Sequence, residues 1–246
     1  MIIENPKVED VPALRQLWKE VFADTDAFLD SFFSKAFSTE RALIVRVDGE
    51  IQAALYWFSC AWGEKTAAYV YAIATKARCR RQGLCSALME KLHSQEKRTI
   101  LVPANEDLRA FYGRMGYWDF GGLEEALYYP DGEEVKTEKL TAPDYAEKRR
   151  SLLPKGGVLQ EGAFLPLLEE LLVFYGGEGW LMAGREEEGE FVAAEFLGDR
   201  SLLPGILKSI RYPKARVCLP GEAPFAMVRS ADGESSGPSY FAFALD

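Results

Sequence analysis

The chain has 246 residues, of which 48% are hydrophobic and 27% charged, and its formal net charge is −9. This length and composition predict a globular protein with one large domain or two of ordinary size, and they exclude a disordered chain. The acidic balance disfavours general nucleic-acid binding, because an acidic surface repels the phosphate backbone.

The sequence predicts neither a membrane span nor a metal or disulfide framework. No stretch approaches the roughly 20 consecutive apolar residues of a spanning helix, and the N-terminus lacks the charged-then-apolar pattern of a signal peptide. We therefore expect a cytoplasmic protein without membrane contact. The four cysteines show no C-x-x-C spacing and His93 is the only histidine, so zinc is not expected either. His93 itself is predicted to be a surface residue on a helix.

The first 75 residues predict two helices followed by strands. After a short strand at 2–4, apolar residues recur at helical spacing from Val11 to Phe22, and Asp10 is placed to cap that helix. A second helix follows Asp24-Thr25-Asp26 and carries apolar residues from Phe28 to Phe37. The period then changes, and three strands are expected at residues 41–47, 51–61 and 67–75, the first two joined by the turn Asp48-Gly49.

A basic loop, Lys76 to Ser86, leads from the third strand to a helix that begins near Leu84. A glycine-containing turn that enters a helix N-terminus leaves backbone N–H groups unpaired, and the positive end of the helix dipole adds to their effect. No Asp or Glu occurs from Lys65 through Met89, whereas five Lys and Arg residues do. The loop therefore predicts an anion-binding site, with a solvated basic turn as the alternative.

The segment after this helix is the second informative one. A short strand at 99–102 precedes Asn105, which can cap a helix, and Gly116 lies where a left-handed residue would end it. Tyr112 shares the apolar face of that helix, so it can be a core residue or a functional one. A strand at 117–120 follows.

The rest of the chain predicts a second unit. Residues between Pro130 and Pro143 are polar and bracketed by prolines, which is typical of a linker. We therefore expect a first domain at 1–130, a linker at 131–142 and a second domain at 143–246. Within the second domain, helices are expected at 163–175 and 201–210, and strands at 180–183, 191–196, 215–219, 225–228 and 240–245.

The order of these features resembles a known family. The strand, the basic loop Arg80-x-x-Gly83-x-Cys85, the next helix and strand, Asn105 and the Phe111-Tyr112 helix are together similar to the GNAT superfamily, the acetyl-coenzyme A dependent N-acyltransferases. The likeness covers roughly the first 125 residues, and Cys85 departs from the Gly or Ala that the family usually has. It implies an α/β (α+β) fold in which helices flank a mixed, mostly antiparallel central sheet.

The second half resembles a smaller, degenerate GNAT-like α+β domain. Its strand-to-helix junction, Phe196 to Ser201, has a single glycine and an aspartate that would oppose a phosphate. The resemblance therefore implies no acyl-donor site of its own, and an unrelated α+β domain is the alternative.

For the first half, the resemblance implies binding of acetyl-coenzyme A as the acyl donor, without a metal. The amides around 81–86 would hold the pyrophosphate, and the backbone of 73–75 would pair with the pantetheine arm as an added strand. The donor-binding residues that the resemblance implies are Ile73, Ala74, Thr75, Arg80, Arg81, Gln82, Gly83, Leu84, Cys85, Ser86 and Asn105.

The resemblance also assigns Tyr112 as the catalytic residue that protonates the departing thiolate, and packing in the core is the alternative. Cys85 is expected to have a lowered pKa at a helix N-terminus beside arginines, although direct attack by an amine needs no enzyme nucleophile. The general base is left open among Asp26, Asp30 and a water chain. Three aromatic residues, Tyr56, Trp57 and Trp62, line an acceptor pocket or pack in the sheet.

The sequence thus predicts an N-acetyltransferase that acts on the primary amine of a small molecule or peptide by direct attack. The alternative is a coenzyme A-binding regulator or scaffold with little or no turnover. Neither nucleic acid nor a membrane is expected as a partner.

Overall fold

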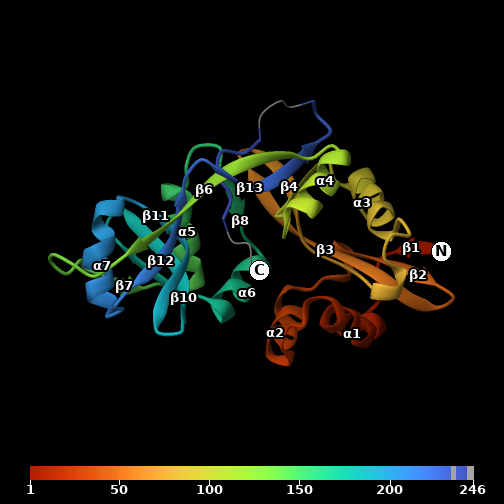
Figure 1. Cartoon of the computed structure of the whole chain (residues 1–246), viewed down its shortest axis with the longest axis horizontal. Helices are drawn as coiled ribbons and strands as arrows, with labels where there is room; N and C mark the ends of the chain where they lie inside the picture. Colours follow the sequence, from red (N-terminus) through yellow and green to blue (C-terminus); the bar gives the residue numbers. More distant parts are fainter. Residues whose placement is uncertain (234–236, 243–246) are drawn as a thin grey trace.

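A long strand, β6 (Trp118–Tyr128), crosses the middle of the molecule and joins its two halves (Figure 1). The computed structural model describes residues 1–233 and 237–242. The strands of this part form one path of hydrogen-bonded neighbours in the order β1-β2-β3-β4-β5-β13-β6-β12-β11-β10-β9-β7, and β8 pairs with β3 beside it. The other strands are β1 (Ile2–Glu4), β2 (Ala42–Val47), β3 (Glu50–Trp62), β4 (Lys65–Thr75), β5 (Arg98–Leu101), β7 (Glu138–Lys139), β8 (Val158–Gln160), β9 (Val173–Gly177), β10 (Trp180–Glu187), β11 (Glu190–Leu197), β12 (Ala215–Pro220) and β13 (Ala223–Ser230).

Helices cover the sheet on both faces. They are α1 (Val11–Phe22), α2 (Asp26–Ser31), α3 (Leu84–Gln95), α4 (Glu106–Arg114), α5 (Ala142–Leu152), α6 (Phe164–Leu171) and α7 (Leu203–Ile210). Apolar residues of α3 and α4 pack on one face of the N-terminal half, whereas α1, α2 and α6 pack on the opposite face. The core on that opposite face continues into the second half, because it also includes Leu181 and Leu197.

The sheet of the N-terminal half separates between β4 and β5. These strands pair in parallel only from Ala68 with Thr99 to Val70 with Leu101. In the antiparallel pairing with β3, Tyr56 faces Ala72 and Trp57 faces Val70, so Tyr71 is the extra residue of a β-bulge. Beyond the bulge, β4 pairs with β3, and no described strand pairs with its other edge.

The strands β12 and β13 form one bent segment that runs antiparallel to β6 along its whole length. β13 lies between β5 and β6 in the first half, and β12 lies between β6 and β11 in the second. At the bend, Gly122 and Gly221 approach so closely that a Cβ on Gly122 would lie 1.8 Å from the carbonyl oxygen of Gly221. Only glycine fits at this crossing.

A buried ion pair ties several elements of the second half together. Arg149 of α5 donates to both oxygens of the Glu195 carboxylate on β11, and both side chains are almost fully buried. The hydroxyl groups of Tyr145 and Tyr240 also donate to Glu195, and Arg149 donates to the Val158 carbonyl of β8. Every oxygen of this buried carboxylate is therefore hydrogen-bonded, as burial of a charge requires.

The predicted fold class is confirmed, and the helices at 11–22, 84–95 and 203–210 lie where the periodicity placed them. The predicted helix after Asp24-Thr25-Asp26 is also confirmed, as α2 continued by a π-helical turn at Phe32–Ala36. Two local predictions are wrong. The expected helix at 163–175 ends at Leu171 and gives way to β9. Asp10 does not cap α1, because its carboxylate accepts from the Lys7 N–H and pairs with Arg46.

The region expected as a linker begins with irregular chain and then contributes β7, while α5 starts at Ala142. The domain boundaries at 130 and 143 stay a prediction. The strand expected at 240–245 is absent from the described residues Tyr240 to Ala242, and 243–245 lie outside the described part of the chain.

Candidate active site

The open edge of β4 is the first part of the candidate site. Ile73, Ala74 and Thr75 pair with Leu55, Ala54 and Ala53 of β3. Their other edge has no strand partner in the described part of the chain, because β5 has already diverged. Backbone groups on such an edge can bind an extended ligand as if it were another strand.

The loop after β4 supplies the second part. Arg81 has φ 61° and Gly83 has φ 78°, and helix α3 starts directly after Gly83 with no side chain capping it. The first helical hydrogen bond runs from Ala87 N–H to the Gly83 carbonyl at 2.9 Å. No protein oxygen among the described residues accepts from the N–H groups of residues 81–86. We call these N–H groups the amide cradle.

Space remains in front of the amide cradle. A Cβ built on Gly83 would have no atom within 4 Å, and residues 81–83 are exposed. Consecutive N–H groups in alternating left-handed and right-handed conformations, combined with a helix N-terminus, form a concave anion site. The amide cradle therefore has the features of a backbone anion-binding site.

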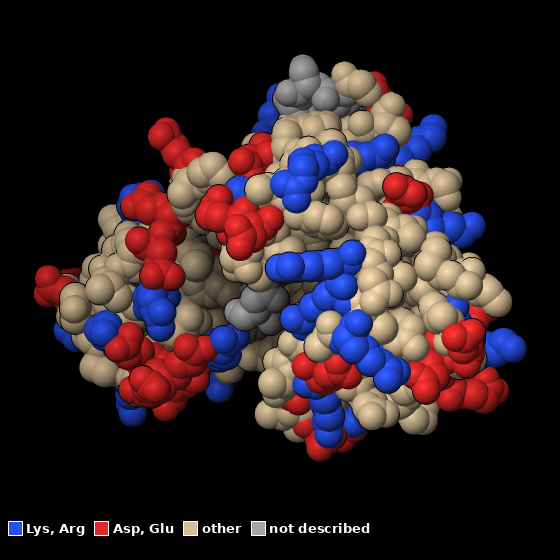
Figure 2. Space-filling model, turned by 45° about the vertical axis from the view of Figure 1, so that its right-hand side comes forward, with Lys and Arg blue, Asp and Glu red and all other residues tan. Residues whose placement is uncertain are grey.

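The positive charge of the loop is only partly neutralised. Lys76 and Arg78 both pair with Glu50, at 3.5 and 2.7 Å. Arg80 and Arg81 form no ion pair with any described residue. Lys and Arg side chains are also spread over the face that the N-terminal half presents in Figure 2, although the chain as a whole is acidic. Two arginines thus stay available for an anion beside the amide cradle.

The pKa of the Cys85 thiol is not lowered as expected. Burial raises the pKa of Cys85 to about 11, because desolvation disfavours the thiolate. The side chain packs against the core formed by α3 and α4. The expectation of a lowered pKa was wrong because it took account of the helix terminus and not of the elements packed over it.

Tyr112 lies on α4, and the two residues predicted to start and end this helix, Asn105 and Gly116, are found at its ends. Asn105 Oδ1 accepts from the Leu108 N–H at 2.9 Å at the start, and Gly116, with φ 86°, ends the helix. Tyr112 is 7% exposed, and its ring lies 5.2 Å from the ring of Phe111 and 5.9 Å from that of Tyr117. Burial raises the pKa of Tyr112, so the hydroxyl keeps its proton at neutral pH. Tyr112 is therefore a core residue whose hydroxyl can donate a hydrogen bond.

A polar cluster behind Tyr112 was missed by the sequence analysis. His93 Nε2 lies 3.0 Å from the Tyr117 hydroxyl oxygen, which is also 2.5 Å from Thr99 Oγ1. Burial, aided by Arg229, lowers the pKa of His93 to about 4. The prediction of a surface histidine is thus wrong. The spacing carried a usable signal, because His93 is four residues after Met89 and shares its buried helix face.

The residues considered for base catalysis and acceptor binding do not form one site. Asp26 and Asp30 are exposed and pair with Arg15, and Lys19 lowers the pKa of Asp26 further. Tyr56 and Trp57 are buried on opposite faces of β3, as the two separate cores show. The packing alternative therefore describes both aromatic residues.

The corresponding junction of the second half differs from the amide cradle. Asp199 Oδ1 accepts from the Ser201 N–H at 2.9 Å, and Arg200 pairs with Glu124 at 3.4 Å. The aspartate thus uses a backbone donor that an anion would need.

Two further observations concern metals and membranes. Within residues 1–233 and 237–242, no three His, Cys, Asp or Glu side chains cluster as a metal site. No helix in the same residues is long and apolar enough to cross a bilayer.

The chain is similar to a known family in sequence over its first half and to solved structures in fold over both halves. The family model of the acetyltransferase (GNAT) domain matches residues 3–120. No curated protein matches the chain in sequence. Solved structures with a similar fold include the GCN5-related N-acetyltransferase from Kribbella flavida, at 16% identity and a TM-score of 0.72 over 94% of this chain and 71% of that one.

Two more structures extend the likeness. The GCN5-related N-acetyltransferase from Anabaena variabilis shares 12% identity and a TM-score of 0.74, over 94% of this chain and 73% of that one. A protein from Pyrococcus horikoshii shares 10% identity and a TM-score of 0.68, over 98% and 92% of the two chains. At these identities the similarity concerns the fold, and it extends over both halves.

Proposed function

Residues 3–120 match the family model of the acetyltransferase (GNAT) domain, and on this premise we propose that the chain moves an acetyl group from acetyl-coenzyme A to the primary amine of a small molecule or peptide. The observation that carries the proposal is the amide cradle, whose N–H groups have no protein acceptor among the described residues. It stands at the end of the strand whose open edge, Ile73 to Thr75, could hold an extended arm.

The residues proposed to bind the donor follow from this geometry. The N–H groups of 81–86 would donate to the pyrophosphate, helped by the charges of Arg80 and Arg81. The backbone of 73–75 would pair with the amides of the pantetheine arm. Asn105 would contact the donor from the N-terminus of α4, since its side-chain amide nitrogen is not used in capping.

The proposed acetyl transfer needs no nucleophile from the enzyme, because the acceptor amine attacks directly. The acceptor amine attacks the thioester carbonyl, the carbon–sulfur bond breaks, and the thiolate must leave as a thiol. Tyr112 would stabilise the departing sulfur by a hydrogen bond from its hydroxyl, which burial keeps protonated. The proton that the amine nitrogen loses would reach the sulfur through that hydroxyl, so the products are the amide and the free thiol. Neither Asp26 nor Asp30 is proposed as the base that deprotonates the amine, because each is held by a cation.

The second half is proposed to act as a degenerate GNAT-like domain without its own donor. Its junction at Asp199 uses the backbone donors internally, and its core is continuous with that of the first half. It would therefore support the first half rather than perform a second reaction.

Binding and turnover test the proposal separately. Acetyl-coenzyme A at about 100 times its Kd should add roughly 2.7 kcal/mol to the free energy of unfolding, which is measured as a rise in Tm. Thiol release is then followed over a panel of primary amines. A missing Tm shift at millimolar acetyl-coenzyme A would refute the donor site, and a shift without thiol release for any amine would favour the regulator over the enzyme.

A further inference from the structure

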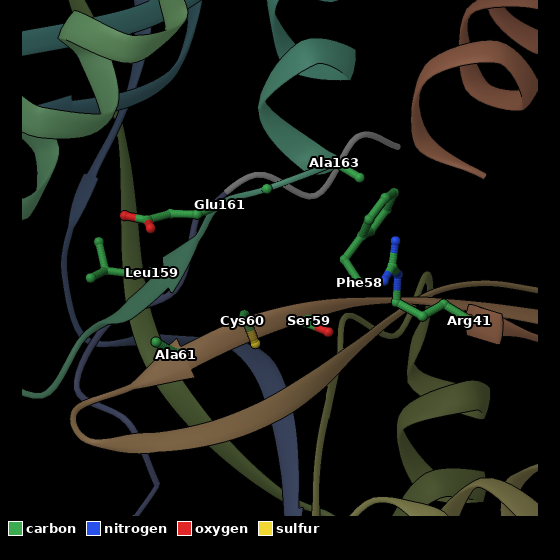
Figure 3. A pocket seen from close by; sticks show the side chains of 9 residues that line it. Arg41, Phe58, Ser59, Cys60, Ala61, Leu159, Glu161 and Ala163 are labelled. Carbon is green, nitrogen blue, oxygen red and sulfur yellow. The ribbon is translucent and has the colours of Figure 1, made fainter. Parts of the chain in front are cut away.

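A cavity of about 450 Å³ lies away from the amide cradle, on the outer edge of β3 (Figure 3). Its floor is apolar and includes Phe58, Cys60 and Leu159. Figure 3 shows Arg41 and Phe58 at one end of it and Glu161 and Leu159 at the other. Neither the donor site nor Tyr112 lies in its lining.

The cavity coincides with an interruption in the sheet. On the outer side of β3, the first residue of β2, Ala42, pairs with Tyr56, and the last residue of β8, Gln160, pairs with Cys60. Trp57, Phe58 and Ser59 have no strand partner on that side in the described part of the chain. We call this three-residue interruption the β3 notch.

Among the residues that the structure describes, no strand pairs with the outward-directed backbone groups of the β3 notch. In an antiparallel strand, each residue directs both its N–H and its C=O to the same neighbour, and successive residues alternate. At least one of the three notch residues therefore directs both groups into the cavity. Buried backbone groups need a hydrogen-bond partner, so the notch favours a ligand that brings an amide backbone.

Arg41 gives the notch a charge and a direction. It is half-buried in the turn directly before β2, and no carboxylate of a described residue pairs with it. The one acidic residue among the cavity's lining, Glu161, already forms a two-bond ion pair with Arg150. A carboxylate is the partner that matches the planar geometry of a guanidinium, because it can accept two parallel hydrogen bonds from it.

Strand polarity places that carboxylate at one end of the ligand. Both β2 and β8 run antiparallel to β3, so a ligand strand in the same direction starts at Gln160 and ends at Arg41. We propose that the β3 notch binds the carboxyl-terminal end of an extended peptide, about three residues long, with its terminal carboxylate on Arg41. This site is independent of the proposed acetyl transfer.

A short peptide that cannot serve as an amine acceptor tests the site. N-acetyl-Ala-Leu-Ala with a free carboxylate should bind in isothermal titration at least ten times more tightly than the same peptide with a C-terminal amide. Methylation of its backbone nitrogens should also weaken binding, because it removes donors to the β3 edge. Equal affinity of acid and amide, or no binding of either, would overturn the proposal.

Variants at the arginine assign the contact. Arg41→Gln should abolish the preference for the acid, whereas Arg41→Lys should retain part of it because the charge remains. Arg185→Gln is the matched control, since Arg185 lies on β10 in the second half. A preference for the acid that survives in Arg41→Gln would contradict the assignment. Since the peptide has no free amine, the result does not depend on whether the chain transfers acetyl groups.

Discussion

The hydroxyl group of Tyr112 distinguishes the proposed catalytic role of this residue from its role in core packing. Tyr112→Phe keeps the ring contacts with Phe111 and Tyr117 and removes only the proton donor. We expect kcat to fall about 100-fold, with the Kd for acetyl-coenzyme A unchanged. Steady-state thiol release and titration of the donor measure the two quantities.

The matched control for this prediction is Tyr212→Phe. The Tyr212 hydroxyl donates to Glu186 in the second half, so its removal should leave kcat unchanged. If Tyr112→Phe is as active as the parent, Tyr112 is a core residue only.

Gly83 can be tested through its backbone conformation. Its φ of 78° is strained for alanine, at a cost of about 1 kcal/mol, although a Cβ would meet no atom within 4 Å. Gly83→Ala should therefore lower Tm slightly and raise the Kd for acetyl-coenzyme A, because the loop relieves its strain by moving the amide cradle. Gly132→Ala is the control, with φ 67° and equally open space. Equal Kd values for the two variants would contradict the role of the cradle.

His93 predicts a pH dependence of stability. Its pKa is lowered from 6.5 to about 4, so the unfolded chain takes up a proton that the folded chain does not. The contribution of His93 is complete above about pH 6.5 and declines as the pH falls towards 4, by on the order of 1 kcal/mol after allowance for its partial exposure. Chemical denaturation at pH 5 and 7.5 should show a smaller loss for His93→Gln than for the parent. An equal loss would show that His93 does not titrate in this window.

Single residues also show where sequence analysis succeeds. Asn105, Gly116 and Gly83 were predicted correctly as helix boundaries, because a cap depends on the local backbone. Cys85 and His93 were predicted wrongly, because their pKa values depend on segments far along the chain that bury them.

Among the helices and strands, most were predicted from the spacing of their apolar residues. The helices α1 and α3 follow their apolar spacing closely. The segment after Leu171 was assigned to a helix although Val173 to Tyr175 are typical strand residues, and tertiary pairing with β10 decides for β9. Neither the β3 notch nor the bent path of β12 and β13 could be predicted, because both result from pairings between distant segments.

For the molecule as a whole, β13 makes the two halves interdependent. It pairs with β5 and β6 of the first half, although most of the second half of the chain lies between β6 and β13 in the sequence. A fragment of residues 1–130 should therefore show no cooperative thermal transition by circular dichroism, because an unpaired gap replaces β13 in its sheet. The full chain should unfold in one transition, since one core spans both halves.

A redesigned fragment provides the control. The register places Ala223 opposite Leu123, so residues 1–123 can be joined to 223–230 by an Asn-Gly turn. This fragment should regain a cooperative transition, at a lower Tm than the full chain because α6 and β8 are missing. If residues 1–130 melt cooperatively at the temperature of the full chain, the strand is dispensable.

The late position of β13 also has a consequence for biosynthesis. About a hundred residues must leave the ribosome after β6 before the strand beside it exists, which takes roughly 5 to 20 seconds. During this interval the nascent chain exposes β5 and β6 as open edges that neighbouring polypeptides could join. Chaperone demand during translation is therefore built into the chain's connectivity.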